Sequence, residues 1–425
     1  MDGGNATAGR PDTDERPFVL IWELTQACEL ACKHCRAEAE PERHPGELTT
    51  AEAKAFLEDC REFAEDQLVV FSGGDPLARD DAVDLVEYGT DLGLRVTMTP
   101  SGTASLDAGA IEDLADAGLR RMALSLDGAS AAAHDGFRKE AGSFASTVRA
   151  ARATRRAGLP LQINTTVCAE TVGELPALAE LVEDLGAVLW SVFFLVPVGR
   201  GRALEPISPE HAESVMEWLL TASEERSFGV KTTEAPHYRR VALQNSRGES
   251  PTSARGDLPT GAQRDSPTGD RGDPPTGTRE DASAAAREGA PAGADHDDDG
   301  DQGSTPDRDR IGRNAGITAG DGFAFVSHLG DVYPSGFLPE SAGNVREESV
   351  VDIYRDADLF ADLRDPDALR GKCGACPYRR VCGGSRSRAY AYTGDPLESD
   401  PLCAYVPEGY EGSLPEQRLP PIGSG

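Results

Sequence analysis

The sequence contains no apolar run close to the roughly 20 residues that a membrane-spanning helix needs. Its first 16 residues are polar and lack the apolar stretch of a secretory signal. These two absences argue against an integral membrane protein and against an exported one. We therefore expect a soluble protein that works in the cytoplasm.

Lysine is scarce, with five residues against 37 arginines and 73 acidic residues, and the formal net charge is -31. Residues 246–313 contribute only -6 of this charge, from 15 acidic and 9 basic side chains, so -25 belongs to the rest of the chain. Such acidity argues against a nucleic-acid partner, because phosphate binding needs a basic surface. Acidity spread over the whole chain predicts a protein of a high-salt cytoplasm, as in a halophilic organism.

Aromatic residues are missing from the whole stretch between Tyr238 and Phe323, which consists mainly of Gly, Pro, Ser, Thr, Asp and Arg. A segment of this composition cannot bury enough apolar area to offset the entropy of ordering. We predict a disordered arm at 1–16, a core at 17–243, a disordered insertion at 244–315, a cysteine-rich domain at 316–408 and a tail at 409–425.

Nine cysteines are present, most of them in two groups. Close spacing and an odd number favour metal ligation in a reducing compartment over a disulfide framework. The first group, Cys28, Cys32 and Cys35, follows directly on the apolar run Phe18–Thr25. Three thiolates can hold three irons of a 4Fe-4S cluster and leave the fourth open, as in a catalytic rather than a structural metal site. A zinc knuckle or a trio of reduced thiols is the alternative.

Strand and helix patterns alternate after this motif, which indicates βαβ units and a parallel sheet. Counting from Phe18 gives six strands, which suits an open barrel, and several strand patterns end in polar or glycine residues. Ligands of such folds gather at the carboxyl ends of the strands. The candidate ligand residues at these ends are Gly73, Gly74, Asp75, Ser125 and Asn164. Cys60 and Cys168 are interpreted as buried thiols without a ligand role.

The second cysteine group consists of Cys373, Cys376, Cys382 and the more distant Cys403. Four thiolates in this spacing can enclose a metal completely, and zinc would accept them as readily as an iron-sulfur cluster would.

The two cysteine groups together resemble those of radical S-adenosylmethionine (SAM) enzymes with a SPASM-type C-terminal extension. The resemblance implies a partial (β/α)6 barrel with a small C-terminal iron-sulfur domain. It implies a SAM-binding 4Fe-4S cluster on Cys28, Cys32 and Cys35, and an auxiliary 4Fe-4S cluster on Cys373, Cys376, Cys382 and Cys403. Serines at 335 and 385 stand where related enzymes carry further cysteines, so we expect only one auxiliary cluster.

In the family, SAM is contacted by a Gly-Gly-Glu-Pro motif, which reads Gly73-Gly74-Asp75-Pro76 here. Asp75 keeps the charge of the glutamate but is one methylene shorter. By the same resemblance, Ser125, Arg138 and Asn164 would contact the ribose, methionine or carboxylate of SAM. A ferredoxin or flavodoxin would supply the electron that cleaves SAM.

The closest pattern within the family is that of enzymes that modify porphyrin side chains, including alternative heme synthesis by oxidative decarboxylation of iron-coproporphyrin. His237, Tyr238 and Arg239 would then be weak candidates for substrate contacts. One alternative is a maturase that modifies a ribosomal peptide. Another is a non-catalytic carrier of SAM, heme or an iron-sulfur cluster, or a zinc-structured scaffold.

Overall fold

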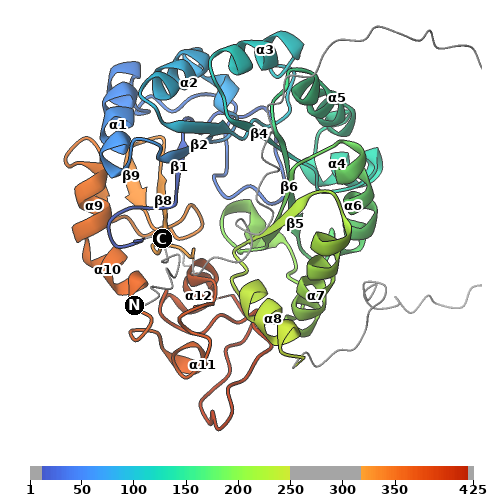
Figure 1. Cartoon of the computed structure of the whole chain (residues 1–425), viewed down its shortest axis with the longest axis vertical. Coiled ribbons are helices and arrows are strands. Elements are labelled where there is room, and N and C mark those ends of the chain that lie inside the picture. Colours follow the sequence, from blue (N-terminus) through green and yellow to red (C-terminus); the bar gives the residue numbers. More distant parts are fainter. Residues whose placement is uncertain (1–11, 249–316, 420–425) are drawn as a thin grey trace, which may run out of the picture.

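The computed structural model describes residues 12–248 and 317–419. Its strands form one sheet of ten in the order β10-β9-β8-β1-β2-β3-β4-β5-β6-β7. All pairings from β8 to β7 are parallel, and only β8 with β9 and β9 with β10 are antiparallel. The sheet curves into an open barrel with helices on its outside (Figure 1).

The strands are short and alternate with helices over the first half of the chain. The strands are β1 (Val19–Glu23), β2 (Leu68–Ser72), β3 (Arg95–Met98), β4 (Arg121–Ser125), β5 (Leu161–Val167), β6 (Leu189–Phe194), β7 (Gly229–Thr233), β8 (Phe323–Val326), β9 (Asp331–Tyr333) and β10 (Gly343–Asn344). The helices are α1 (Thr50–Phe63), α2 (Ala82–Asp91), α3 (Ala108–Asp116), α4 (Ala131–Arg138), α5 (Ser143–Arg156), α6 (Leu175–Asp184), α7 (Pro209–Glu225), α8 (His237–Ser246), α9 (Val350–Asp356), α10 (Asp358–Arg364), α11 (Gly371–Gly374) and α12 (Arg386–Thr393).

The six predicted barrel strands are confirmed as β1 to β6. The sequence pattern missed the helix α4 and the strand β7, which extends the parallel sheet beyond β6. It also did not show that β8 pairs in parallel with β1, so that the C-terminal part of the chain continues the barrel sheet. The pairing of β1 with β8 joins segments that are far apart in the sequence and leaves no local signal. The strand β7 was missed because its sequence, Gly-Val-Lys-Thr-Thr, is too polar to show an apolar run.

The predicted arm and insertion lie largely outside the described residues, whereas most of the predicted tail, 409–419, is described. Within the described part, Thr13 is buried, and its carbonyl oxygen accepts a hydrogen bond of 2.6 Å from the Tyr354 hydroxyl. Gln417, in the predicted tail, donates to the carbonyl oxygen of Ile207. The ends of the described chain are therefore held to the fold at these two points.

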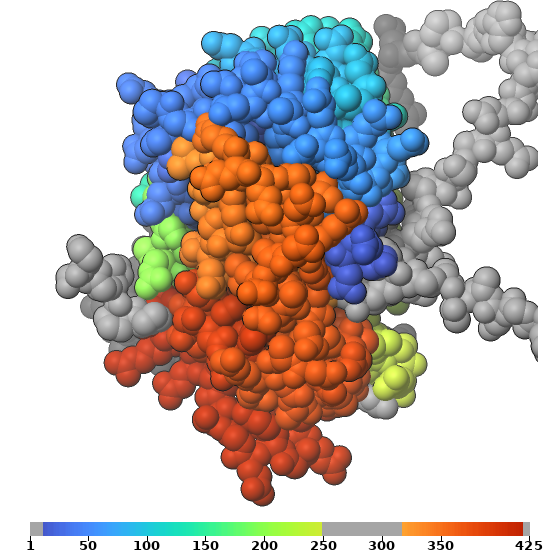
Figure 2. All heavy atoms as spheres, turned by 90° about the vertical axis from the view of Figure 1, so that its left-hand side faces the viewer, coloured from blue at the N-terminus to red at the C-terminus, as the bar shows by residue number. Residues whose placement is uncertain are grey.

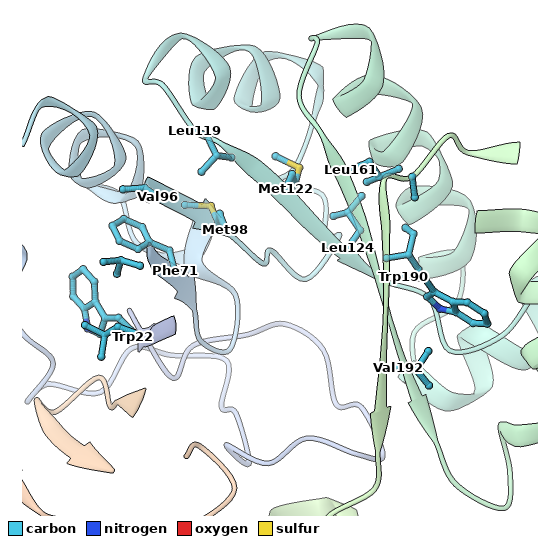
Figure 3. Packing of buried hydrophobic residues seen from close by; sticks show 14 of the residues in the cluster. Trp22, Phe71, Val96, Met98, Leu119, Met122, Leu124, Leu161, Trp190 and Val192 are labelled. Atoms are coloured by element: carbon cyan, nitrogen blue, oxygen red, sulfur yellow. The ribbon is translucent and has the colours of Figure 1, made fainter. Parts of the chain in front are cut away.

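The core lies between the outer face of the sheet and the helices. Its buried residues follow successive strands, with Trp22 and Phe71 at one end of the cluster and Trp190 and Val192 at the other (Figure 3). Helix α1 shows how the sequence builds one of these layers. Thr49 and Glu52 form a capping box at its start. None of the helices in 12–248 and 317–419 is both long and apolar enough to cross a membrane.

The C-terminal segment packs against the N-terminal part of the barrel on the face shown in Figure 2. Arg388 of α12 is fully buried and connects the two regions. Its guanidinium donates to the carbonyl oxygens of Phe194, Leu195 and Glu234 at 2.7–3.1 Å. It also forms a 3.1 Å ion pair with the buried Asp400. A single side chain therefore joins the ends of two barrel strands to the cysteine-rich region.

We predict that Arg388→Ala lowers the free energy of unfolding by about 3–5 kcal/mol, because it leaves the buried Asp400 carboxylate without this partner. Thermal unfolding followed by circular dichroism measures the change. Arg152→Ala, at an exposed position of α5, is the matched control and should have little effect. Equal melting temperatures for the two variants would contradict this role of Arg388.

Candidate functional site

The first cysteine group lies in the loop that follows β1. Cys28 and Cys32 are buried and Cys35 is half-buried. Each sulfur has a hydrogen-bond donor, because the Leu30 amide lies 3.4 Å from the Cys28 sulfur and the Ala39 amide 3.5 Å from that of Cys35. Such donors stabilise thiolates and are typical of the surroundings of metal-bound sulfur. Burial raises the pKa of the Cys28 thiol, although the hydrogen bonds from Ser101 and the Leu30 amide oppose the shift.

Two side chains that the sequence analysis did not single out hold this loop in place. Glu47 accepts hydrogen bonds from the Thr25 hydroxyl at 2.6 Å and from the Gln26 amide at 3.1 Å. Arg200 donates to the carbonyl oxygens of Cys32 and Ala39. Both residues lie outside the motif, so only the three-dimensional arrangement identifies them.

The glycines after β2 allow that strand end to pass directly against the cysteine loop. The Gly74 amide donates to the Thr25 carbonyl oxygen at 2.8 Å, and the Asp75 amide donates to that of Ala27 at 2.7 Å. A Cβ atom added to Gly74 would lie 2.4 Å from the Ala27 oxygen, and one added to Gly73 would lie 2.5 Å from the Thr25 oxygen. Any side chain at these positions would displace the backbone that leads into Cys28.

The Asp75 side chain is buried and uses its oxygens within the fold. One oxygen accepts from the Leu77 and Ser101 amides, and the other accepts from the Thr103 hydroxyl at 2.7 Å. Burial raises the pKa of Asp75, although these hydrogen bonds oppose the shift. Asp75 therefore organises the ends of β2 and β3 beside the cysteine loop. Its predicted contact with SAM stays a prediction.

Arg138, at the end of α4, reaches the cysteine loop from the opposite side. Its Nε donates to Asp127 at 3.0 Å, and its Nη1 lies 3.5 Å from the Cys32 sulfur. Burial alone would raise the pKa of Asp127, but the guanidinium of Arg138, together with smaller contributions from His34, His134 and the Thr166 amide, lowers it. The Nη2 of Arg138 is buried and has no hydrogen-bond partner among the described residues. An unpartnered guanidinium nitrogen beside a thiolate suits an anionic ligand such as a carboxylate.

Ser125 and Asn164, the other predicted SAM contacts, stand opposite each other in the register of β4 and β5. Asn164 accepts a 2.7 Å hydrogen bond from Gln162.

Cys60 and Cys168 are both fully buried, Cys60 in α1 and Cys168 beside Thr171. Their burial agrees with the prediction that they are buried thiols without a ligand role. The structure thus brings the strand ends to one side of the sheet and leaves the two isolated cysteines in the packed interior.

The second cysteine group lines one partly open cavity. The Arg386 guanidinium lies 3.6 Å from the Cys373 sulfur, and the Tyr378 amide lies 3.4 Å from that of Cys376. Burial raises the pKa of Cys403 to about 12 and raises that of Cys382 further. Thiols in this cavity would stay protonated unless a metal offset the cost of burying their charge. The cavity is lined by Cys373, Cys376, Cys382, Cys403, His237, Arg240, Lys372, Arg379, Gly383, Gly384 and Tyr405.

Two buried nitrogens test whether this cavity fits an anionic cluster. His237 and Arg240, both on α8, are each 1% exposed. The Nδ1 of His237 and the Nε of Arg240 have no hydrogen-bond partner within the described part of the chain. Buried donors are nearly always paired, so the Nε–H of Arg240 points to an acceptor in the cavity. The Nε2 of His237 faces the Asp400 carboxylate at 2.9 Å, which leaves its Nδ1 as an acceptor when the ring is neutral. The four sulfurs and the surrounding cationic side chains fit a thiolate-ligated iron-sulfur cluster.

The three predicted substrate contacts have other partners in the structure. His237 is buried with its Nε2 2.9 Å from Asp400, and Tyr238 packs in the main hydrophobic cluster. Arg239 donates to the carbonyl oxygens of Ile317 and Val381. These contacts link α8 to the C-terminal region, and the stretch is not the solvated turn that its composition also allowed. The substrate role of the three residues stays a prediction.

Ser335 and Ser385, which stand where further cysteine ligands would be, both donate to the carboxylate of Glu234. Ser387 donates to the same carboxylate at 3.0 Å. Among the described residues, Glu234 is one of three non-glycine residues with a positive φ, at 55°. The sequence analysis missed this residue, because neither its backbone conformation nor its partners leave a local pattern. A hydrogen-bonded group of three serine hydroxyls and the Glu234 carboxylate therefore occupies the place where further cysteine ligands would stand.

The comparisons with known proteins agree with this arrangement. The profile of the radical SAM superfamily matches residues 22–182. The chain is 37% identical over 391 residues to the AdoMet-dependent heme synthase of Methanosarcina barkeri, covering 92% of this chain and 97% of that protein. It is 29% identical to the pre-heme d1 synthase of Dinoroseobacter shibae, covering 91% of this chain and 85% of that one.

Among solved structures, the crystal structure of Streptococcus suis SuiB bound to S-adenosylmethionine superposes with a TM-score of 0.63. It covers 92% of this chain and 78% of SuiB at 14% sequence identity. At this identity the likeness concerns the fold alone, and it extends from the barrel into the C-terminal region.

We predict that Gly74→Ala lowers the free energy of unfolding by about 1–3 kcal/mol, because its Cβ displaces the backbone before Cys28. The iron bound by the cysteine loop should fall as well, which iron analysis of the reconstituted protein measures. Gly136→Ala is the control, since a Cβ there meets nothing within 4 Å. If Gly74→Ala keeps both its iron and its stability, the close passage of the two segments does not matter for the site.

Proposed function

The chain belongs to the radical SAM superfamily, and we propose that it modifies the carboxylate side chains of a tetrapyrrole in heme biosynthesis, by oxidative decarboxylation of iron-coproporphyrin. The radical SAM role in heme biosynthesis rests on 37% identity to an AdoMet-dependent heme synthase over nearly the full length of both proteins. The observation that carries the chemistry is the loop of Cys28, Cys32 and Cys35, in which three sulfurs with hydrogen-bond donors lie beside a buried, incompletely paired arginine.

In this proposal Cys28, Cys32 and Cys35 hold three irons of a 4Fe-4S cluster whose fourth iron binds SAM. When bound, the cluster and SAM together supply a 5′-deoxyadenosyl radical that can abstract a substrate hydrogen atom. The Nη2 of Arg138 is the candidate donor to the SAM carboxylate. Gly73 and Gly74 let the ligand approach the end of β2 closely, and Asp75 fixes that strand end. Ser125 and Asn164 remain candidate contacts on β4 and β5.

We further propose one auxiliary 4Fe-4S cluster on Cys373, Cys376, Cys382 and Cys403. The unpartnered Nε of Arg240 supports it, because this nitrogen supplies a donor to an anionic group in the cavity. The bonding of Ser335 and Ser385 to Glu234 supports the absence of a second auxiliary cluster.

The reaction needs an electron donor, and a ferredoxin or flavodoxin of the same cell is the proposed partner. A peptide maturase is the second candidate function, since the fold is shared with SuiB, whose crystal structure has also been determined with the precursor peptide SuiA. The far higher identity to a heme synthase favours the tetrapyrrole. A carrier without catalysis is disfavoured, because an open-iron site has no use in passive transport.

Cys32→Ala should abolish reductive cleavage of SAM, because it removes one of the three thiolates that hold the catalytic cluster. Chromatography of 5′-deoxyadenosine after anaerobic reaction with SAM and dithionite measures the loss. Cys60→Ala, a buried cysteine within α1, is the matched control and should retain SAM cleavage. Retained cleavage in Cys32→Ala would remove the cysteine loop from the mechanism.

Cys376→Ala should lower the iron content by about one cluster, roughly four irons per chain, while some SAM cleavage persists. Cys168→Ala, a buried cysteine that belongs to neither cysteine group in the sequence, should leave the iron content unchanged. Metal analysis of both variants decides the point. An unchanged iron content together with lost zinc would identify the C-terminal site as a zinc site.

A further inference from the structure

The inner face of the barrel carries a row of polar side chains across β4 to β7. On these strands Met122, Ile163, Trp190 and Val230 point outward into the main hydrophobic cluster. Because side chains alternate along a strand, the residues between them point to the inside of the barrel. The strand register aligns Ser125 with Asn164, Asn164 with Ser191, and Ser191 with Lys231. These four residues form one row on the inner face.

Lys231 is the cation at the end of this row, and it has no partner. Within 12–248 and 317–419 its ammonium makes no hydrogen bond and no ion pair. The side chain is only half-buried, so the ammonium is within reach of a ligand. Burial and then the charges of Arg121 and Arg239 lower the pKa of Lys231 to about 8. At neutral pH most of the side chain is therefore still protonated.

Arg121, at the start of β4, is a second cation with few partners on the inner face. Its Nη1 lies 3.4 Å from the Gln162 side-chain oxygen, and its Nε is buried with no hydrogen-bond partner among the residues described. Arg121 also lies near enough to Lys231 to lower the pKa of the lysine. The positive charges of Lys231 and Arg121 repel each other, and this repulsion lowers the stability of the protein without a ligand. The chain contains 73 acidic residues, yet none of the described ones forms an ion pair with either cation. Such an arrangement suits a ligand that brings its own negative charge.

The row also gives the distance from Lys231 to Asn164, which is one of the proposed SAM contacts. Asn164 and Lys231 are separated by two strand spacings, which is about 10 Å between their backbones. A ligand that reaches Lys231 with an anionic group therefore extends across the inner face toward Asn164. A small monocarboxylate cannot span this distance, whereas a planar macrocycle with several carboxylate arms can.

We infer that Lys231, assisted by Arg121, binds a carboxylate of the substrate other than the one that reacts, and so fixes which side chain faces the radical. This inference rests on the proposed function, because it assumes a substrate with more than one carboxylate. It makes Lys231 a positioning and specificity residue and not a catalytic one. Lys231 would then favour multiply carboxylated tetrapyrroles over their neutral esters.

The test is anaerobic titration of the full-length reconstituted protein with iron-coproporphyrin, followed by porphyrin absorbance. Lys231→Met should raise the dissociation constant about 10- to 100-fold, the range expected for a lost charged hydrogen bond. Lys231→Arg should stay near the wild type. Lys54→Met is the control and should bind normally, because it removes an α1 ammonium that lies over the Tyr88 ring of α2. Formation of 5′-deoxyadenosine without porphyrin should be the same in all four proteins.

Melting temperatures without porphyrin separate this role from a structural one. Removing an unpaired, half-buried charge should leave the stability of Lys231→Met unchanged or raise it, whereas loss of a structural contact would lower it. Arg121→Gln should weaken porphyrin binding in the same direction and provides a second variant. Wild-type affinity in Lys231→Met would overturn the inference and leave the proposed function standing. Failure of the wild type itself to bind iron-coproporphyrin would instead contradict the proposed substrate, and with it the carboxylate-binding role of Lys231.

Discussion

The close passage of the end of β2 against the loop after β1 is the constraint on which the rest of the site depends. Two backbone hydrogen bonds, from the Gly74 and Asp75 amides, tie these segments together. They leave no room for a side chain at Gly74. Glu47 and Arg200 then fix the loop from two further directions. The positions of the three sulfurs are thus set by backbone contacts before any metal binds, as a preorganised cofactor site requires.

The barrel and the cysteine-rich region share one sheet and one buried network. β8 continues the parallel sheet next to β1, and Arg388 bonds the ends of barrel strands to the loop that carries Asp400. The cavity of the second cysteine group is closed by His237 and Arg240 from α8 as well as by its own loop. The barrel therefore supplies part of the wall of the auxiliary site. A change at this boundary would affect both parts of the protein.

Local patterns were enough to predict six barrel strands, both cysteine groups and the polar strand ends, because each depends on neighbouring residues. Long-range contacts left no such pattern. The strand β7 has few apolar residues and is defined by its pairing with β6, and Glu234 is recognisable only through the three serines that contact it. His237 was predicted to face a substrate from its residue type, yet its burial against Asp400 depends on a loop 163 positions away. Similarly, Lys231 stands out only once the strand register is known.

The measurement that tests the account most directly is an anaerobic reaction of the reconstituted protein at high salt with SAM, a reductant and iron-coproporphyrin. Porphyrin mass and 5′-deoxyadenosine are followed together in the same samples. The account predicts stepwise loss of carboxyl groups from the porphyrin in proportion to the 5′-deoxyadenosine formed. An unchanged porphyrin in protein that forms 5′-deoxyadenosine would contradict the tetrapyrrole assignment. Formation of neither product by protein with its full iron content would contradict the radical mechanism itself.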